Sequence, residues 1–463
     1  MQKFVNRATE LNFLNDEFTA ERSSFTVVYG RRRVGKTSLL REFIRTKRAI
    51  YFLAESESDL ENRFAFARSL NGFNEDVDFT RYATPEWEEM LLKICDYSKT
   101  GRIVLVIDEY QYLCMARAGF SSVLQRIWDT RMQDSNIMLV LCGSLVGMME
   151  SETLNYGSPL YGRRTGQIRL MQIEYRYYHE FFTELGENKL IPLYSVTGGI
   201  PKYIEQFSGK KPLIEEITAV ILNKNSLLYE EPIFLLENEV RDLGSYFSLL
   251  KTIAQGEHKI GKIATRMGVR QQQLTRHLET LRTLDLIERI VPVTEEYPEK
   301  SKKGLYFIKD NFIEFWFKFV YPYRSYLELG NIAYVQERLS ERLIENHVSF
   351  VYEKICRENF RSNSSAICGS HYHKTGRWWD NASEIDFVAL NEESGEIAFG
   401  ECKYTTAMVD IDVYHELKHK AANVVWHNSE RQKKYVIYGK NGFTKRLVTL
   451  AKESADIFLI KLG

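Results

Sequence analysis

GRRRVGKT, residues 30–37, decides how this chain begins to fold, because it fits the phosphate-binding pattern G-x-x-x-x-G-K-[ST] at every fixed position. An apolar run, residues 25–29, comes directly before it, and a helix-like run, residues 38–44, comes directly after it. Strand, glycine loop and helix form the context that the pattern requires. The glycines let the backbone turn tightly and point its N–H groups at an anion. The sequence therefore predicts a nucleotide site at this loop.

The chemistry of the loop assigns a role to each of its side chains. We expect Lys36 to reach the β- and γ-phosphates of ATP and Thr37 to hold Mg²⁺. The backbone of the loop and the first turn of the helix should surround the phosphates. The predicted nucleotide-binding set at the loop is Gly30, Arg31, Arg32, Arg33, Val34, Gly35, Lys36, Thr37 and Ser38.

A second apolar run, residues 103–107, ends in two carboxylates, Asp108 and Glu109. A strand buried on both faces of a parallel sheet delivers such acids to the ligand-binding edge. We expect Asp108 to bind Mg²⁺ through water and Glu109 to orient and polarise the attacking water. The alternative is two solvated acids at a strand end.

Three further features follow along the chain. Residues 136–144 predict another strand, and Ser144 at its end is either a sensor of the nucleotide or an ordinary strand-end serine. Arg163 and Arg164 are candidates for an arginine that stabilises charge on the transferred phosphoryl group, or are surface residues. A glycine pair and Pro201 interrupt helical sequence and predict a fixed turn.

The order of these segments resembles the archaeal-type ATPases, which are AAA+-related P-loop proteins. The resemblance is carried by FVNRATELNFL, GRRRVGKTSLL, IVLVIDEYQYL, VLCGSLVGMM, LYGRRTGQIRL and TGGIPKYIEQF, and it covers roughly the first half of the chain. It implies that Pro201 lies near the nucleotide base. It also implies that Arg7 and Glu10 form the family's N-terminal R-x-x-E element.

The length and composition of the chain limit the number of its domains and the kinds of partner it can bind. At 463 residues the chain is long enough for about three domains. Lys+Arg and Asp+Glu are both 62, so any nucleic-acid surface must be a local patch. The six cysteines form no C-x-x-C pair, which is typical of reduced thiols in a cytoplasmic protein. The N-terminus resembles no signal peptide and no run is long enough to span a membrane, so we expect no membrane partner.

The middle of the chain predicts two modules. Residues 206–244 are helical and acidic, as expected of a lid on the nucleotide. Residues 245–325 predict a winged helix-turn-helix with helices at 245–255, 260–267 and 271–284 and wing strands at 291–293 and 305–308. Arg270, Gln271, Gln272, Thr275, Arg276, Arg282, Lys300, Lys302 and Lys303 could meet DNA, or the module serves only for packing or relay. The aromatic helix 311–319 is interpreted as buried core.

In the last region, residues 326–463, a predicted hairpin places Glu401 and Lys403 on one face of a strand, beside Asp386 on its neighbour. Asp386 and Glu401 could hold Mg²⁺ or Mn²⁺, and Lys403 could activate the attacking water. This pattern resembles the PD-(D/E)XK nuclease core, with Glu353 as the helical acid and Ile385 in place of the proline. The alternative is a degenerate nuclease fold. A C-x-x-H-x-H stretch at 368–373 has no fourth zinc ligand at a recognisable spacing.

The sequence thus predicts an α/β P-loop ATPase domain (residues 1–205), a helical lid, a winged helix-turn-helix and a nuclease-like α/β domain. The expected function is an ATP-binding and ATP-hydrolysing molecular switch with Glu109 and Arg163 as catalytic residues. The alternatives are an ATP-gated, metal-dependent DNA nuclease using Lys403, and a non-enzymatic ATP-binding scaffold for a protein partner. The biological target and the oligomeric state stay open.

Overall fold

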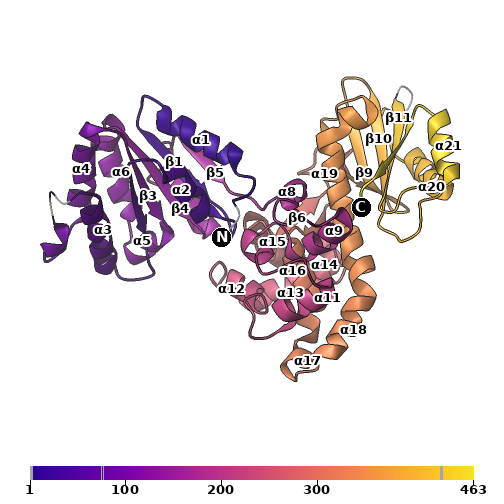
Figure 1. Cartoon of the computed structure of the whole chain (residues 1–463), viewed down its shortest axis with the longest axis horizontal. Helices are drawn as coiled ribbons and strands as arrows, with labels where there is room; N and C mark the ends of the chain where they lie inside the picture. The colour runs from indigo at the N-terminus through magenta and orange to yellow at the C-terminus, as the bar shows by residue number, and fades with distance from the viewer. Residues whose placement is uncertain (1–3, 75, 77, 428–430) are drawn as a thin grey trace. The chain divides into compact units, whose positions relative to one another are not determined.

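The computed structural model describes residues 4–74, 76, 78–427 and 431–463, and the chain divides into two compact units (Figure 1). Unit 1 takes Met1–Ile173, Ile200–Glu205 and Phe234–Arg241. Unit 2 takes Glu174–Gly199, Gln206–Ile233 and Asp242–Gly463. The segment predicted as one lid, residues 206–244, is therefore shared between the two units.

Unit 1 is built on a five-stranded sheet in the order β2-β3-β4-β1-β5, and every paired neighbour is parallel. Every residue of β1, β3 and β4 is buried, as expected for central strands of a parallel sheet that is covered on both faces. The three strands predicted from the apolar runs are confirmed. The strands are β1 Ser24–Tyr29, β2 Ala49–Leu53, β3 Ile103–Asp108, β4 Ile137–Gly143 and β5 Gly166–Arg169.

Helical segments connect these strands, as parallel neighbours require, and others precede β1 or follow β5. They are α1 Ala8–Thr19, α2 Lys36–Ile44, α3 Asp59–Phe73, η1 Phe79–Arg81, α4 Trp87–Tyr97, η2 Ser98–Thr100, α5 Gln111–Ala116, α6 Phe120–Thr130, η3 Met132–Asp134, α7 Val146–Met149, η4 Glu150–Leu154 and α10 Pro201–Ile204. Helix α12, Glu231–Glu237, crosses from unit 2 into unit 1.

In unit 2, three helices precede a two-stranded antiparallel ribbon, the order predicted for the winged helix-turn-helix. Leu274, Leu278 and Leu281 are buried, as their spacing predicted. The first ribbon strand is β6 Ile287–Ile290, so the prediction of a wing strand at 291–293 is wrong. Pro292 has no N–H for a ladder, and Val293 instead donates its N–H to Arg377 O (2.9 Å). The elements are α13 Leu243–Ala254, α14 Ile260–Met267, α15 Gln271–Thr283, β6 and β7 Leu305–Ile308.

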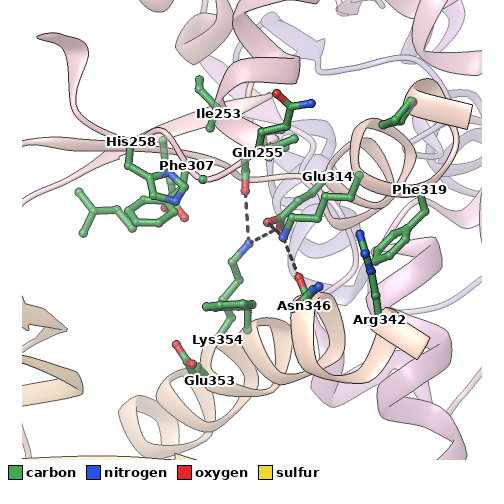
Figure 2. A pocket seen from close by; sticks show the side chains of 18 of the residues that line it. Ile253, Gln255, His258, Phe307, Glu314, Phe319, Arg342, Asn346, Glu353 and Lys354 are labelled. Carbon is green, nitrogen blue, oxygen red and sulfur yellow. Dashed lines mark hydrogen bonds and ion pairs between the residues drawn. The ribbon is translucent and has the colours of Figure 1, made fainter. Parts of the chain in front are cut away.

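A second set of helices in unit 2 packs around the aromatic helix α16, Asn311–Phe319, whose aromatic side chains are all buried as predicted. Residues 332–368 form one long helical stretch that contains a π-helical turn and carries Glu353, the predicted helical acid. Helices of this set line a cavity of about 560 Å³ (Figure 2). The elements are α8 Tyr175–Tyr178, α9 Glu187–Thr197, α11 Leu213–Ile217, η5 Thr218–Leu222, η6 Tyr321–Tyr323, α17 Arg324–Glu328, α18 Ile332–Leu343, η7 Ile344–Val348 and α19 Ser349–Cys368.

The C-terminal part of unit 2 holds a mixed five-stranded sheet in the order β12-β11-β10-β9-β8, drawn in orange to yellow in Figure 1. Its core contains Ile385, Val388, Phe399, Leu417 and Tyr435. The predicted hairpin is confirmed: β9 pairs antiparallel with β10, and Gly400 lies opposite Phe387. The elements are β8 Lys374–Trp379, β9 Glu384–Asn391, β10 Glu396–Lys403, α20 Ile411–Ala422, β11 Gln432–Gly439, α21 Lys445–Glu453 and β12 Ile457–Lys461.

Two sequence expectations concern the whole chain. All six cysteines are free, and all but Cys114 are buried. Across the part of the chain that the structure describes, every helix is too short or too polar to cross a membrane.

Candidate functional site

The loop between β1 and α2 has a backbone that only glycine fits at its two ends. Gly30 and Gly35 have φ angles of 151° and 98°. A Cβ atom on Gly30 would lie 2.5 Å from the carbonyl oxygen of Leu170, which is too close for any side chain. Helix α2 begins at Lys36, directly after Gly35, so its positive end and unpaired N–H groups face the loop. The loop is built as an anion cradle.

Lys36 lies buried inside this loop. Its Nζ donates to the carbonyl oxygens of Gly30 and Arg31, each at 2.8 Å. Burial lowers the pKa of Lys36, and the charges of Glu109 and Asp108 oppose that effect. A phosphate at the loop would add the anion that favours the charged form of this lysine.

Thr37 and Asp108 come together as the motif predicts. Thr37 Oγ1 donates to Asp108 Oδ2 at 2.9 Å, and the Tyr51 hydroxyl donates to the same oxygen at 2.6 Å. Hydroxyl and carboxylate oxygens are ligands that Mg²⁺ prefers, so this donor set fits the metal that accompanies ATP. Sequence reasoning missed Tyr51, which lies on β2 in register with Val106 of β3.

Glu109 is held by two side chains from neighbouring segments. Its Oε2 accepts hydrogen bonds from Ser144 Oγ (2.8 Å) and from the Gln111 amide. Its backbone has a φ of 53°, which is uncommon for a residue with a side chain and often marks a functional site. The structure therefore brings Glu109 and Ser144 together, and it adds Gln111, which the motif did not identify.

Two segments named through the family resemblance lie against the loop. A Cβ atom on Gly35 would lie 4.0 Å from Pro201 Cγ, so the predicted turn is adjacent to the phosphate cradle. Arg7 donates to Val34 O (3.0 Å) and Met171 O (2.8 Å), and it pairs with Glu10 at 3.3 Å. The hydrogen bonds of Arg7 thus stabilise the position of the loop next to Met171.

Glu239 is a partly buried carboxylate of unit 1 that sequence reasoning did not place at the site. Its Oε1 accepts from the Val146 N–H (3.3 Å), two residues after Ser144. Burial raises the pKa of Glu239 to about 7, although the charges of Arg32, Arg31 and Lys36 oppose the rise. A titrating acid therefore faces the cationic loop.

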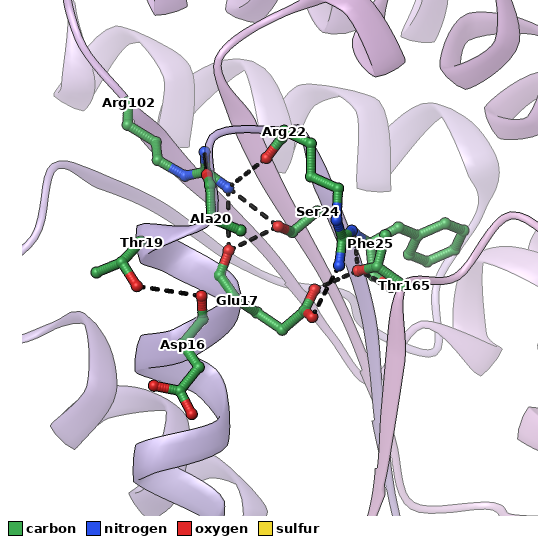
Figure 3. A network of polar contacts seen from close by, with 9 residues as sticks. All are labelled: Asp16, Glu17, Thr19, Ala20, Arg22, Ser24, Phe25, Arg102 and Thr165. Atoms are coloured by element: carbon green, nitrogen blue, oxygen red, sulfur yellow. Dashed lines mark hydrogen bonds and ion pairs between the residues drawn. The ribbon is translucent and has the colours of Figure 1, made fainter.

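Arg163 lies elsewhere, so its predicted role at the nucleotide is not supported within this chain. It forms two hydrogen bonds with Asp129, both at 2.7 Å. Thr165, two residues on, bonds to Phe25 near the start of β1, whereas the loop follows the end of β1. Figure 3 shows Thr165 in a network around Glu17 with Arg22, Ser24 and Arg102. Arg163 belongs to the edge of the sheet opposite the loop because β5 runs parallel to β1.

The C-terminal candidates also come together. Asp386 Oδ2 accepts from the Cys402 N–H (2.7 Å), and Glu401 Oε1 accepts from Lys403 (2.8 Å) and Lys420 (3.4 Å). Burial raises the pKa of Asp386 well above its usual range, and the charges of Glu353 and Glu401 add to the rise. A carboxylate cluster thus exists where the D…ExK pattern predicted it.

The two predicted metal ligands of this cluster, Asp386 and Glu401, are not joined by a larger ligand group in the described part of the chain. Within residues 4–74, 76, 78–427 and 431–463, no group of three or more His, Cys, Asp or Glu side chains could hold a metal ion. That finding covers both the D…ExK cluster and the C-x-x-H-x-H stretch. Glu401 is instead neutralised by its two lysines. The assignment of Asp386 and Glu401 as metal ligands stays a prediction.

Comparisons with known proteins agree with the P-loop geometry. Residues 4–207 match a family described as an ATPase domain predominantly from Archaea. Residues 316–425 match a second family, described as archaeal and bacterial proteins of unknown function. An uncharacterised protein of Methanocaldococcus jannaschii is 32% identical over 463 residues, which is 99% of each chain.

A solved structure resembles the fold. A Walker-type ATPase of Pyrococcus abyssi aligns with a TM-score of 0.53 at 19% identity and covers 68% of this chain and 96% of its own. The ORC2 protein of Aeropyrum pernix, solved in ADPNP–ADP complexes, aligns with a TM-score of 0.47 at 14% identity, covering 72% of this chain and 96% of its own.

Proposed function

Because the chain belongs to one family with the Methanocaldococcus jannaschii protein, and its residues 4–207 match the archaeal ATPase domain, we propose that unit 1 binds ATP and hydrolyses it as a molecular switch. The observation that carries this proposal is the contact of Thr37 with Asp108 at the mouth of the loop, beside a Glu109 that Ser144 holds in place. These residues combine phosphate binding, metal binding and a base in one place.

Each group of the site has a separate role in binding or hydrolysis. The N–H groups of the loop and Lys36 bind and orient the phosphates. Bound Mg²⁺, held through Thr37 and Asp108, would neutralise charge on the phosphate oxygens. The Glu109 carboxylate, fixed by Ser144 and Gln111, accepts a hydrogen bond from the attacking water and takes its proton. Pro201 closes the loop side of the site next to Gly35.

Two variants test this assignment. Lys36→Ala should strongly weaken binding of a fluorescent ATP analogue at the P-loop, because it removes the charge that faces the phosphates. Glu109→Gln should retain binding and lose about 100-fold or more in turnover, because an amide takes up no proton from water. A well-folded Lys36→Ala protein with wild-type affinity, or a Glu109→Gln protein with wild-type turnover, would refute the corresponding role.

The consequence of ATP turnover for unit 2 is also a proposal. The module of α13, α14, α15, β6 and β7 is proposed to be a winged helix-turn-helix that responds to the nucleotide. Arg270, Gln271, Gln272, Thr275 and Arg276 are exposed on and beside α15, which supports contact with DNA. Arg282 and Lys303, however, pair with Glu279 and Glu295, which weakens the local positive charge.

The nuclease alternative is favoured by one observation, the clustering of Asp386, Glu401 and Lys403 on adjacent strands near Glu353. Titration calorimetry with Mn²⁺ on wild type, Asp386→Ala and Lys403→Ala, with DNA cleavage assays in parallel, tests it. Metal binding lost in Asp386→Ala and cleavage lost in Lys403→Ala would support a nuclease. The absence of Mn²⁺ binding in wild type would make the sheet a degenerate nuclease fold.

A further inference from the structure

The cavity of about 560 Å³ in unit 2 lies far along the chain from the P-loop and is not used by the proposed ATPase. Figure 2 shows it between His258 of the connection from α13 to α14, Phe307 of the β-ribbon, Glu314 of the aromatic helix, and α18–α19, which contribute Arg342 and Lys354. Its volume falls in the range of about 300–1,000 Å³ that is usual for small-molecule sites.

The lining of the cavity is cationic. It contains six Lys and Arg side chains, against three glutamates: Arg266, Lys318, Arg342, Lys354, Arg357 and Arg377, with Glu288, Glu314 and Glu353. Glu314 is already matched inside the protein, because Lys318 lies at 2.8 Å and Lys354 at 3.7 Å. Among the residues that the structure describes, Arg342 and Arg357 make no hydrogen bond or ion pair. Two arginines therefore face the cavity with donor capacity to spare.

An aromatic wall stands beside these cations. Phe307 stacks on the His258 ring with centroids 4.1 Å apart, and the Arg377 guanidinium lies 5.2 Å from the Phe307 ring centroid. Burial lowers the pKa of His258, so this ring is neutral at pH 7 and adds no charge to the wall. Phe319 and Phe350 also line the cavity. Flat apolar faces of this kind bind a heteroaromatic ring.

We propose that this cavity is a second nucleotide site, which binds a nucleoside mono- or diphosphate. Its phosphates meet Arg342, Arg357 and Lys354, and its base packs against the wall of Phe307 and His258. Arginine suits this role because its planar donors match phosphate oxygens two at a time. The cavity lies between the β-ribbon and helix α19, so a bound nucleotide would contact both elements of unit 2 and stabilise their arrangement.

The test uses the full-length chain with Lys36→Ala, which weakens the P-loop site, and ADP as the probe in titration calorimetry. ADP should still bind with a stoichiometry of one. Arg342→Ala or Arg357→Ala in that background should weaken ADP binding at least about tenfold, since each variant loses a charge-assisted hydrogen bond to phosphate. Phe307→Leu should weaken ADP more than inorganic phosphate. The matched control is Arg338→Ala, on the same helix as Arg342 but paired with Glu341 and outside the cavity lining.

Several results would overturn the proposal. ADP binding that Arg342→Ala, Arg342→Gln and Arg357→Ala all leave unchanged would be residual binding at the P-loop. The absence of ADP binding to folded Lys36→Ala at millimolar ADP would remove the site. Inorganic phosphate binding as tightly as ADP would show that the wall does not recognise a base. A short single-stranded oligonucleotide that binds tighter than ADP, and loses affinity in Arg342→Ala, would make the cavity part of a nucleic-acid surface.

Discussion

Binding of ATP should draw a proton onto Glu239. This carboxylate has a pKa of about 7, raised by burial and held down by the charges of Arg32, Arg31 and Lys36. Phosphates in the loop pair with those cations and add negative charge of their own. Both changes make ionised Glu239 less favourable, so its pKa should rise further on binding.

The size of the proton uptake follows from the pKa. A further rise of one unit, from about 7 to about 8, corresponds to ~1.4 kcal/mol of coupling. The difference in protonation between the bound and free states is then about 0.4 proton at pH 7 and about 0.5 at pH 7.5, and it falls to about 0.1 at pH 6 and pH 9. The expected profile is a bell centred between the two pKa values.

Titration calorimetry of ATP in two buffers with different enthalpies of ionisation measures this uptake. The Glu239→Gln protein is the control, because it retains the proton changes of ATP itself. The wild-type value minus the control value should peak near pH 7.5. Equal proton uptake in both proteins across pH 6–9, with ATP bound by each, would refute the placement of Glu239 in the field of the loop.

Three further outcomes follow from individual contacts. Tyr51→Phe should raise the Mg²⁺ concentration needed for half-maximal ATP turnover, because Asp108 loses a 2.6 Å hydrogen bond; an unchanged Mg²⁺ dependence would contradict this. Arg163→Ala should leave ATP turnover within about twofold of wild type and lower the melting temperature, because Arg163 bonds to Asp129 away from the loop. A large loss of turnover would restore its catalytic role. Glu314→Gln should cost about 3–5 kcal/mol in the free energy of unfolding, because two lysines lose their buried partner; less than about 1 kcal/mol by denaturant titration would contradict it. Burial opposes ionisation of Glu314, yet Lys318 and Lys354 lower its pKa to about 2 from 4.5. The ionised carboxylate therefore stabilises the fold above pH 4.5, and this stabilisation is lost as the pH falls towards 2. The Glu314→Gln variant should lose that pH dependence.

The parts of the site that could be predicted are those written in contiguous sequence. The loop, the acid-ended strand and the D…ExK hairpin each combine a short motif with a pattern of hydrophobic residues that identifies a strand or a helix. The side chains of the loop and of the acid-ended strand meet because the carboxyl ends of parallel strands share an edge. Those of the hairpin meet because β9 and β10 are antiparallel neighbours.

The parts that could not be predicted depend on contacts between distant segments. Glu239 meets Val146 across 93 residues, and no local pattern marks it. Arg163 follows β4 in the sequence, but pairing of β5 with β1 carries it to the opposite edge of the sheet. The wing strand was misplaced by a few residues, because Val293 packs with the C-terminal sheet rather than with its ribbon. In each case tertiary pairing decided the outcome.

The chain passes between its two units five times, near residues 173, 199, 205, 233 and 241. A gene fragment that stops after residue 205 would encode the whole parallel sheet but would lack Glu239. A fragment that begins there would carry part of unit 1 with it. A single junction therefore cannot separate unit 1 from unit 2. Exchange of unit 2 for another domain would require several junctions in one gene.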